Sequence, residues 1–308
     1  VSKLKQTIIT DKMTYVEPNS MSKFASCAGL IFKSGQSGAK VLIDTNLGNE
    51  ETPVLFDQEK PDIVMITHFH LDHSSFTRYV ADYSDTRILI PEKEVPFLTS
   101  FDFMIENTAG LMGMGVPWRD FAMNKLKFRV LKHYESFSEK TSLSHLIPEM
   151  TIVATPGHSP GHTSFYFPDD RILFAGDMGL DRFGPWYGWR NCSIQDIVES
   201  LLKLGSMDIN LILTSHGGMI EKNIHQAFSH SLGHILEREK TITEKLDKGI
   251  KEEDIIQQGI FYKHRDKIPQ PMSSFLHMWD IAMFDHHMTL IREGGILKLF
   301  PELRSMDI

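Results

Sequence analysis

The chain has 308 residues, of which 41% are hydrophobic and 23% are charged, and its formal net charge is -8. This is ordinary globular composition, which excludes a disordered or fibrous protein and allows a large buried core. Because the negative balance provides no overall positive field, we expect neither nucleic acid nor an anionic membrane surface as a partner.

The cysteine content and the hydropathy indicate the cellular compartment to expect for the protein. The two cysteines, Cys27 and Cys192, lie far apart, which excludes a disulfide framework and a cysteine-based metal cluster. No apolar run reaches the roughly 18 to 20 residues that a bilayer-spanning helix needs. The first residues also lack the apolar core of a signal peptide. We therefore expect a cytoplasmic protein without a membrane partner.

Two groups of short β-rich runs occupy the first two thirds of the chain. The first group covers residues 28–90 and contains AGLIFKS, KVLIDT, DIVMIT and RILIP, separated by turn signals such as NLGNEE. Residues 93–148, rich in Phe, Met and Leu, predict a helical insertion with a mobile segment. The second group contains MTIVATPGH, TSFYFPDDRILFAGD and INLILTSHGG. The two groups indicate two halves of one architecture.

Helices are predicted in the last third of the chain. Ser193 precedes IQDIVESLLKL, with Asp196 three residues on, which is typical of a helix start. From about residue 219 the apolar periodicity predicts helices over KNIHQAFSHSLGHILEREKTITEKLDKG, EEDIIQQGIFYK and SSFLHMWDIAMFDHHMTLIREGG. These segments indicate a separate helical layer.

The segment ITHFHLDHSS, residues 66–75, groups metal-competent side chains at the end of an apolar run. His68 and His70 would share one face of a continuing strand, while Asp72 and His73 lie beyond a turn. A lone histidine is more often a satisfied surface or core residue than a ligand, but this clustering favours metal binding. Imidazoles with a carboxylate suit zinc, and manganese and iron accept the same set.

Three later strand-like runs also end in candidate ligands. They are His158 in VATPGHSPGH, Asp177 in ILFAGD and His216 in LILTSHGG. Strand ends are where an α/β scaffold presents its chemistry. One aspartate between two sets of three ligands suits a two-metal centre with room for a bridging water. The sequence therefore predicts two divalent metal ions per chain, most readily zinc.

Taken in this order, these histidines and aspartates resemble the ligand pattern of the metallo-β-lactamase-fold hydrolases, especially their glyoxalase II-like branch. The motifs span residues 44 to 217. The resemblance implies an α/β fold, the metallo-β-lactamase αββα sandwich, with the metals at one edge and a C-terminal helical cap layer. It places the catalytic domain at residues 1–217, including the insertion at 93–148, and the cap at 218–308.

The resemblance also implies which residues each metal takes. The first metal would be held by His68, His70 and His158. The second would be held by Asp72, His73 and His216. Asp177 would bridge the two metals. Asp44, at the end of KVLID, and His162, in PGHSPGH, match positions that support the ligands from behind.

The aromatic loop MGLDRFGPWYGWRN follows ILFAGD, and in glyoxalase II-like relatives this region borders the substrate. We expect Tyr187 to donate a hydrogen bond to a substrate oxygen, with Trp186 and Trp189 forming an apolar wall. The alternative is that these aromatic residues only pack the loop against the helical layer. The stretch LMGMG, with Met112 and Met114, can line an adaptable apolar pocket, although such residues more often belong to the core.

The expected reaction is hydrolysis of a small thioester, lactone or related ester, in which a metal-bound hydroxide attacks the carbonyl. A metal lowers the pKa of bound water from 15.7 toward roughly 7. Asp72 can accept or relay the proton, and the second metal would hold the developing oxyanion. The aromatic and methionine-rich segments favour a small-molecule substrate with an apolar or aromatic acyl group.

Two other functions stay open. A phosphodiesterase can use the same two metals, and a di-iron redox or oxygen-binding protein can use the same ligands. His70 argues against the redox protein, because flavodiiron relatives carry a glutamate at this position. For His277, His286 and His287 we expect packing rather than a further metal site. The helical layer could also form a homodimer interface.

Overall fold

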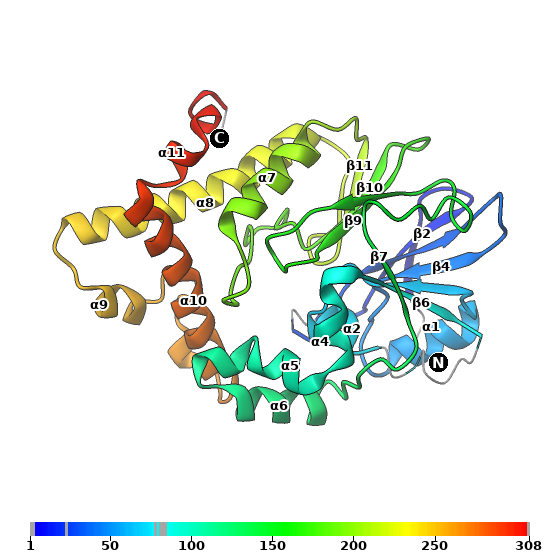
Figure 1. Ribbon diagram of the computed structural model, residues 1–308, viewed down its shortest axis with the longest axis horizontal. Helices are drawn as coiled ribbons and strands as arrows, with labels where there is room; N and C mark the ends of the chain where they lie inside the picture. The colour runs from blue at the N-terminus through cyan, green and yellow to red at the C-terminus, as the bar shows by residue number, and fades with distance from the viewer. Residues whose placement is uncertain (1–3, 22–23, 77–78, 80–84, 307–308) are drawn as a thin grey trace.

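The computed structural model describes residues 4–21, 24–76, 79 and 85–306. Two β-sheets pack face to face, with helices on the outer sides (Figure 1). Their inner faces share a hydrophobic core, in which the ring centroid of Phe32 lies 4.9 Å from that of Phe167. The predicted αββα sandwich with a helical C-terminal region is therefore confirmed.

The first sheet has seven strands in the order of the chain. β1 to β4 pair antiparallel, and β4 to β7 pair parallel. Its strands are β1 (Lys5–Ile8), β2 (Met13–Glu17), β3 (Gly29–Lys33), β4 (Lys40–Ile43), β5 (Ile63–Met65), β6 (Arg87–Pro91) and β7 (Glu135–Phe137). The runs expected within residues 28–90 form β3 to β6, whereas β1, β2 and β7 were not predicted.

The second sheet has five strands in the order β12-β11-β10-β9-β8. β10 and β11 are parallel, and the other neighbours are antiparallel. Its strands are β8 (Thr151–Ala154), β9 (Thr163–Phe167), β10 (Ile172–Gly176), β11 (Leu211–Thr214) and β12 (Met219–Ile220). The four longer strands lie in the predicted runs. Parallel strands end at the same edge, so the residues that follow β10 and β11 are brought together.

Alternating side chains explain how each sheet holds a layer on either side. In β4, Val41 and Ile43 point into the core between the sheets, while Leu42 packs with Leu55 and Phe56 of α1 (Glu51–Glu59). On the second sheet, α7 (Ile194–Gly205) forms the outer layer. As predicted, Ser193 caps the start of α7: its hydroxyl accepts a hydrogen bond of 3.1 Å from the backbone N–H of Asp196.

The insertion predicted at residues 93–148 is helical only in its first part. It contains α4 (Val95–Thr99), α5 (Phe101–Glu106) and α6 (Gly115–Asn124), which are followed by β7 and loops. The short strand Glu135–Phe137 escaped prediction because it pairs only at the sheet edge and has one buried residue. The ring of Trp118 in α6 lies 5.1 Å from that of Phe275 in α10 (Met272–Glu293), so the insertion packs against the C-terminal layer.

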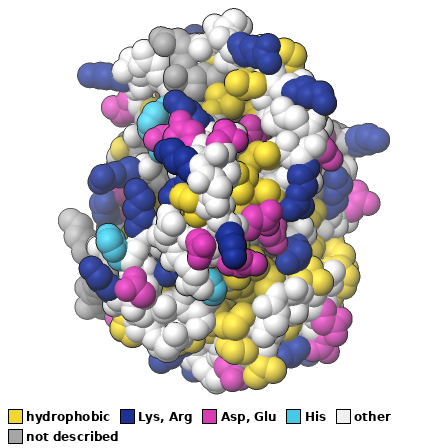
Figure 2. All heavy atoms as spheres, turned by 90° about the vertical axis from the view of Figure 1, so that its left-hand side faces the viewer, with side chains coloured by type: hydrophobic (Ala, Val, Ile, Leu, Met, Phe, Trp, Pro, Cys, Tyr) yellow, Lys and Arg dark blue, Asp and Glu magenta, His cyan; other side chains and the backbone are white. Residues whose placement is uncertain are grey.

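The C-terminal layer consists of α8 (Ile224–Asp247), α9 (Glu252–Gln257), α10 and α11 (Ile296–Leu299). α8 packs along α7, and α10 descends toward α5 and α6 (Figure 1). A buried ion pair between Arg265 and Asp280 fixes the segment between α9 and α10 to α10. On the face that this layer presents, acidic and basic side chains are intermixed (Figure 2). Within the described part of the chain, no helix has the length and apolar character needed to cross a membrane.

Candidate metal centre

The predicted metal ligands come together at one edge of the sandwich. His68 and His70 follow β5, and α2 (Leu71–Ser74) then carries Asp72 and His73. The remaining candidates follow strands of the second sheet, and they are His158 after β8, Asp177 after β10 and His216 after β11. The ligand atoms form two main groups, each within 4.8 Å. The first group is His68, His70 and His158, and the second is Asp72, His73, Asp177 and His216.

The first group consists of buried, neutral imidazoles. Burial lowers the pKa of His68, His70 and His158. The Nδ1 atom of His158 lies 2.9 Å from the backbone oxygen of Trp186, and the Nε2 atoms of His158 and His68 lie 3.2 Å apart. The buried Nε2 atom of His70 has no hydrogen-bond partner among the described residues. Converging nitrogen lone pairs of this kind fit a divalent metal ion.

The second group combines two carboxylates with two histidines. The Nε2 atom of His216 lies 3.0 Å from Oδ2 of Asp72 and 3.5 Å from Oδ2 of Asp177. Burial opposes protonation of His216, but Asp177 and Asp72 together raise its pKa to about 10. Metal ions would replace these protons, because cationic imidazole cannot serve as a ligand. The carboxylate pair and the imidazoles therefore also suit a divalent metal.

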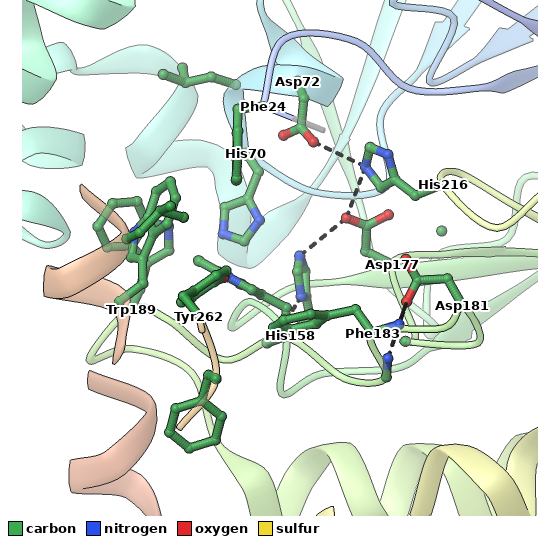
Figure 3. Close-up of a pocket in the computed structure, with 18 of the residues that line it drawn as sticks. Phe24, His70, Asp72, His158, Asp177, Asp181, Phe183, Trp189, His216 and Tyr262 are labelled. Carbon is green, nitrogen blue, oxygen red and sulfur yellow. Dashed lines mark hydrogen bonds and ion pairs between the residues drawn. The ribbon is translucent and has the colours of Figure 1, made fainter. Parts of the chain in front are cut away.

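Asp177 lies between the two groups (Figure 3). Its Oδ2 atom is 3.3 Å from Nε2 of His73 and 3.6 Å from Nε2 of His158. Its Oδ1 atom is buried without a hydrogen-bond partner among the residues that the structure describes. A carboxylate placed in this way fits a ligand shared between two ions.

Asp44 and His162 each contact a member of the second ligand group. Asp44 accepts hydrogen bonds from Thr67 and lies 2.9 Å, through Oδ2, from Nδ1 of His73. This contact holds the Nδ1 proton of His73 and leaves Nε2 facing Asp177. His162 uses both ring nitrogens, since Nδ1 lies 3.1 Å from the backbone oxygen of Thr155 and Nε2 accepts from the N–H of Asp177 at 3.0 Å. His162 therefore has no nitrogen left for a metal.

A cavity of about 440 Å³ opens beside the ligands (Figure 3). All four tryptophans of the chain line it, together with residues from segments that lie far apart in the sequence. Trp186 and Trp189 lie in this lining, as the sequence predicted. Further aromatic residues of the lining were not predicted, among them Phe24, Trp118, Tyr262 and Trp279. For the two tryptophans, the sequence signal is the rarity and large apolar surface of this residue type, which gives no position in space.

The structure corrects the role predicted for Tyr187. Its side chain is fully buried (0% exposed) and does not line the cavity. Its hydroxyl lies 2.7 Å from Nε2 of His287 and accepts a hydrogen bond of 3.2 Å from Arg238. Burial lowers the pKa of His287 to about 3, so this ring is neutral and accepts the hydroxyl proton. The alternative of loop packing against the helical layer is therefore correct for Tyr187.

Met112 and Met114 are also placed differently from the prediction. They line a second cavity, on another face of α10, with polar residues such as His277 and Gln270. The two methionines precede α6, whereas Trp118, within α6, lines the first cavity. Met112 and Met114 are therefore not part of the pocket beside the metal centre.

Two of the three C-terminal histidines, His286 and His287, make packing contacts in this structure. The Nε2 atom of His286 lies 2.8 Å from the backbone oxygen of Trp189, and His287 contacts Tyr187. His277 lies in the lining of the second cavity. These three histidines belong to no metal-competent group among the described residues.

The fold and the ligand groups define an α/β protein with a candidate metal site at the edge of an αββα sandwich. The family model of the metallo-beta-lactamase superfamily matches residues 27–216, and the chain belongs to this superfamily.

Two curated proteins that resemble this chain share only low sequence identity with it. A protein named "probable metallo-hydrolase" from Bacillus subtilis is 25% identical over 50% of this chain and 63% of its own length. A hydroxyacylglutathione hydrolase from Mesorhizobium japonicum is 24% identical over 58% of this chain and 57% of its own length. The chain thus spans less than two thirds of either relative.

Solved structures support the fold over nearly the whole chain. A metallo-beta-lactamase family protein from Thermus thermophilus superposes with a TM-score of 0.67 at 17% identity. The match covers 93% of this chain and 95% of the other, so it includes the C-terminal helical layer.

Proposed function

We propose that the protein is a metal-dependent hydrolase that cleaves a small thioester, lactone or related ester with an apolar or aromatic acyl group. One observation carries the proposal: seven metal-competent side chains lie together, and five of them line a cavity whose walls contain four tryptophans. The distant hydroxyacylglutathione hydrolases, which act on a thioester by name, support the ester-type bond.

Two divalent ions fit the two ligand groups, and zinc suits their mixture of imidazole and carboxylate best, with manganese or iron as alternatives. Bound there, they would supply a hydroxide nucleophile at neutral pH and polarise the carbonyl group of the substrate.

The residues of the chain would do the remaining work. Asp72 lines the cavity, and its Oδ2 atom can hold or pass on the proton of the attacking water beside His216. The backbone oxygen of Trp186 fixes the tautomer and orientation of His158. The rings of Trp186 and Trp189 would hold the acyl group and exclude water from the reacting carbonyl.

The charge of the cavity favours an ester over a phosphodiester. Among the described residues of its lining, Lys263 is the one lysine or arginine, while Asp72, Asp177 and Asp181 are acidic. A phosphodiesterase would be expected to place more cationic side chains around its anionic substrate. His70, a nitrogen ligand, likewise disfavours the redox protein.

The proposal is tested by measuring metal content and hydrolysis on the same sample. Protein purified without added metal is analysed for elements and assayed against alkyl and aryl thioesters, lactones and a bis-aryl phosphodiester, before and after chelation. About two zinc or manganese per chain, with chelator-sensitive thioester or lactone turnover, would support it. Two iron without hydrolysis would favour the redox protein, and turnover of phosphodiesters alone would favour the phosphodiesterase.

A further inference from the structure

We infer that Glu94 is a positioning residue that joins the two loops carrying His68, His70 and His158, and so sets the geometry of one metal group. Glu94 ends the short 3-10 helix Glu92–Glu94, which directly follows β6. Its side chain is fully buried (0% exposed). The inference rests on the metal-binding part of the proposed function and does not depend on which substrate is cleaved.

One carboxylate oxygen of Glu94 holds the loop of the first sheet. Oε2 accepts a hydrogen bond of 2.9 Å from the backbone N–H of Phe69. Phe69 lies between His68 and His70, so its peptide orientation affects the directions of both imidazoles. The contact therefore fixes two of the three ligands through the backbone that carries them.

The other carboxylate oxygen holds the loop of the second sheet. Oε1 accepts a hydrogen bond of 2.8 Å from the hydroxyl of Ser159, and it also accepts from the backbone N–H of Gly161. Ser159 directly follows His158, and both lie in the loop between β8 and β9. The carboxylate thus spans the two halves of the sandwich, with one oxygen for each half.

The chain is adapted to this close approach. A Cβ atom at position 161 would lie 2.8 Å from Oε1 and 2.9 Å from Cγ of Glu94, so only glycine fits there. Burying a carboxylate is costly unless hydrogen bonds compensate, and all three donors here come from the ligand loops. A buried acid with such partners serves the geometry of the loops rather than the packing of a core.

The contacts of Glu94 are confined to one metal group. Asp177 and His216 follow β10 and β11, and among the described residues neither loop donates a hydrogen bond to the carboxylate. Loss of Glu94 should therefore weaken one metal equivalent and spare the other. A residue that only stabilised the fold would not act selectively on one of the two metals.

The test compares metal affinities of Glu94→Gln and the wild-type protein by competition with a coloured chelator, using zinc and cobalt(II). The substitution keeps the size of the side chain but replaces one acceptor oxygen with a donor. We expect one of two equivalents to bind about 10- to 100-fold more weakly, as for other residues that orient metal ligands. The cobalt absorption bands of that site should also change.

Three further variants test whether the effect of Glu94→Gln is specific to the first metal group. His216→Ala disables the second group, and in this background Glu94→Gln should abolish the remaining tight equivalent. Glu92→Gln, a change at an exposed neighbour, should bind two equivalents normally. Ile242→Ala, in a separate core cluster of the C-terminal layer, should lower the unfolding midpoint and still bind both metals.

Each outcome has one meaning. If wild-type protein binds no metal, the proposed function fails and this inference with it. If the wild-type and Glu94→Gln proteins both bind two equivalents with equal affinity, the inference alone is overturned. If Glu94→Gln does not fold, Ser159→Ala decides, since it removes one hydrogen bond to Oε1. A selective loss of the first equivalent supports the inference, and unchanged binding overturns it.

Discussion

Nε2 of His158 lies 3.6 Å from Oδ2 of Asp177, although the two residues follow different strands, β8 and β10. The same oxygen lies 3.3 Å from Nε2 of His73. One carboxylate oxygen therefore contacts a histidine of each metal group, which is the arrangement that a bridging ligand requires.

Asp177→Ala should remove both tight metal binding and turnover. The change deletes a ligand shared by the two groups, so the loss should exceed the roughly 10- to 100-fold effects of residues that only orient ligands. Elemental analysis and the hydrolysis assay check it. Asp170→Ala, at an exposed position in the turn between β9 and β10, is the matched control and should behave as wild type. Full activity of Asp177→Ala would contradict the two-metal arrangement.

Tyr187→Phe should lower stability and leave turnover nearly unchanged. The substitution deprives the buried Nε2 atom of His287 of its donor, which costs about 1 to 3 kcal/mol. Urea unfolding measures this loss, and Tyr134→Phe, at a side chain that is 41% exposed, is the control. A large fall in kcat at unchanged stability would instead return Tyr187 to the reacting site.

Trp189→Leu should change acyl selectivity. Removing part of a cavity wall weakens contact with a large acyl group, so kcat/KM for an aryl thioester should fall about 10-fold relative to an acetyl thioester. Met112→Ala, at a residue of the second cavity, should leave this ratio unchanged. An equal fall for both substrates in Trp189→Leu would mean that the wall does not hold the acyl group.

The unfolding free energy of the metal-free protein should depend on pH through the titration of Glu94. Burial raises the pKa of Glu94 from 4.5 to about 7. Between these values the folded state binds a proton that the unfolded state lacks, so stability falls as pH rises, by about 1.4 kcal/mol per unit. This contribution is fully present below about pH 4.5 and is lost as pH rises through about 7.

Glu94→Gln isolates the effect, because the neutral amide cannot titrate and the nearby histidines contribute equally to both proteins. The unfolding free energy of wild type minus that of Glu94→Gln should therefore decrease between pH 5 and pH 8. Urea unfolding of metal-free samples measures both proteins. Parallel pH profiles would show that Glu94 is not perturbed by its burial.

The grouping of candidate ligands could be anticipated from the sequence because several of them are local. His68, His70, Asp72 and His73 lie within six positions after a β-rich run, and a strand end has a defined place in an α/β sheet. The later ligands also follow strands whose β-branched and aromatic content is strong. Short edge strands such as β7 were missed because they have little apolar pattern.

The walls of the cavity could not be predicted in this way. Trp118 and Trp279 belong to helices separated by more than 150 positions in the sequence, and only tertiary packing brings their rings to 5.8 Å. The direction in which a loop side chain points also cannot be predicted from the sequence. Trp186 and Tyr187 are adjacent, yet one lines the cavity and the other enters the core of the helical layer.

Part of the cavity wall comes from helices that carry none of the candidate ligands, which is useful for protein engineering. The metal ligands all belong to loops and the short helix at the ends of sheet strands, whereas Trp118 and Trp279 come from α6 and α10. A library that varies only those two helices would alter the shape offered to substrates without touching a ligand. These two walls and the candidate ligands lie on different stretches of the chain, so the walls can be varied while the ligands are kept.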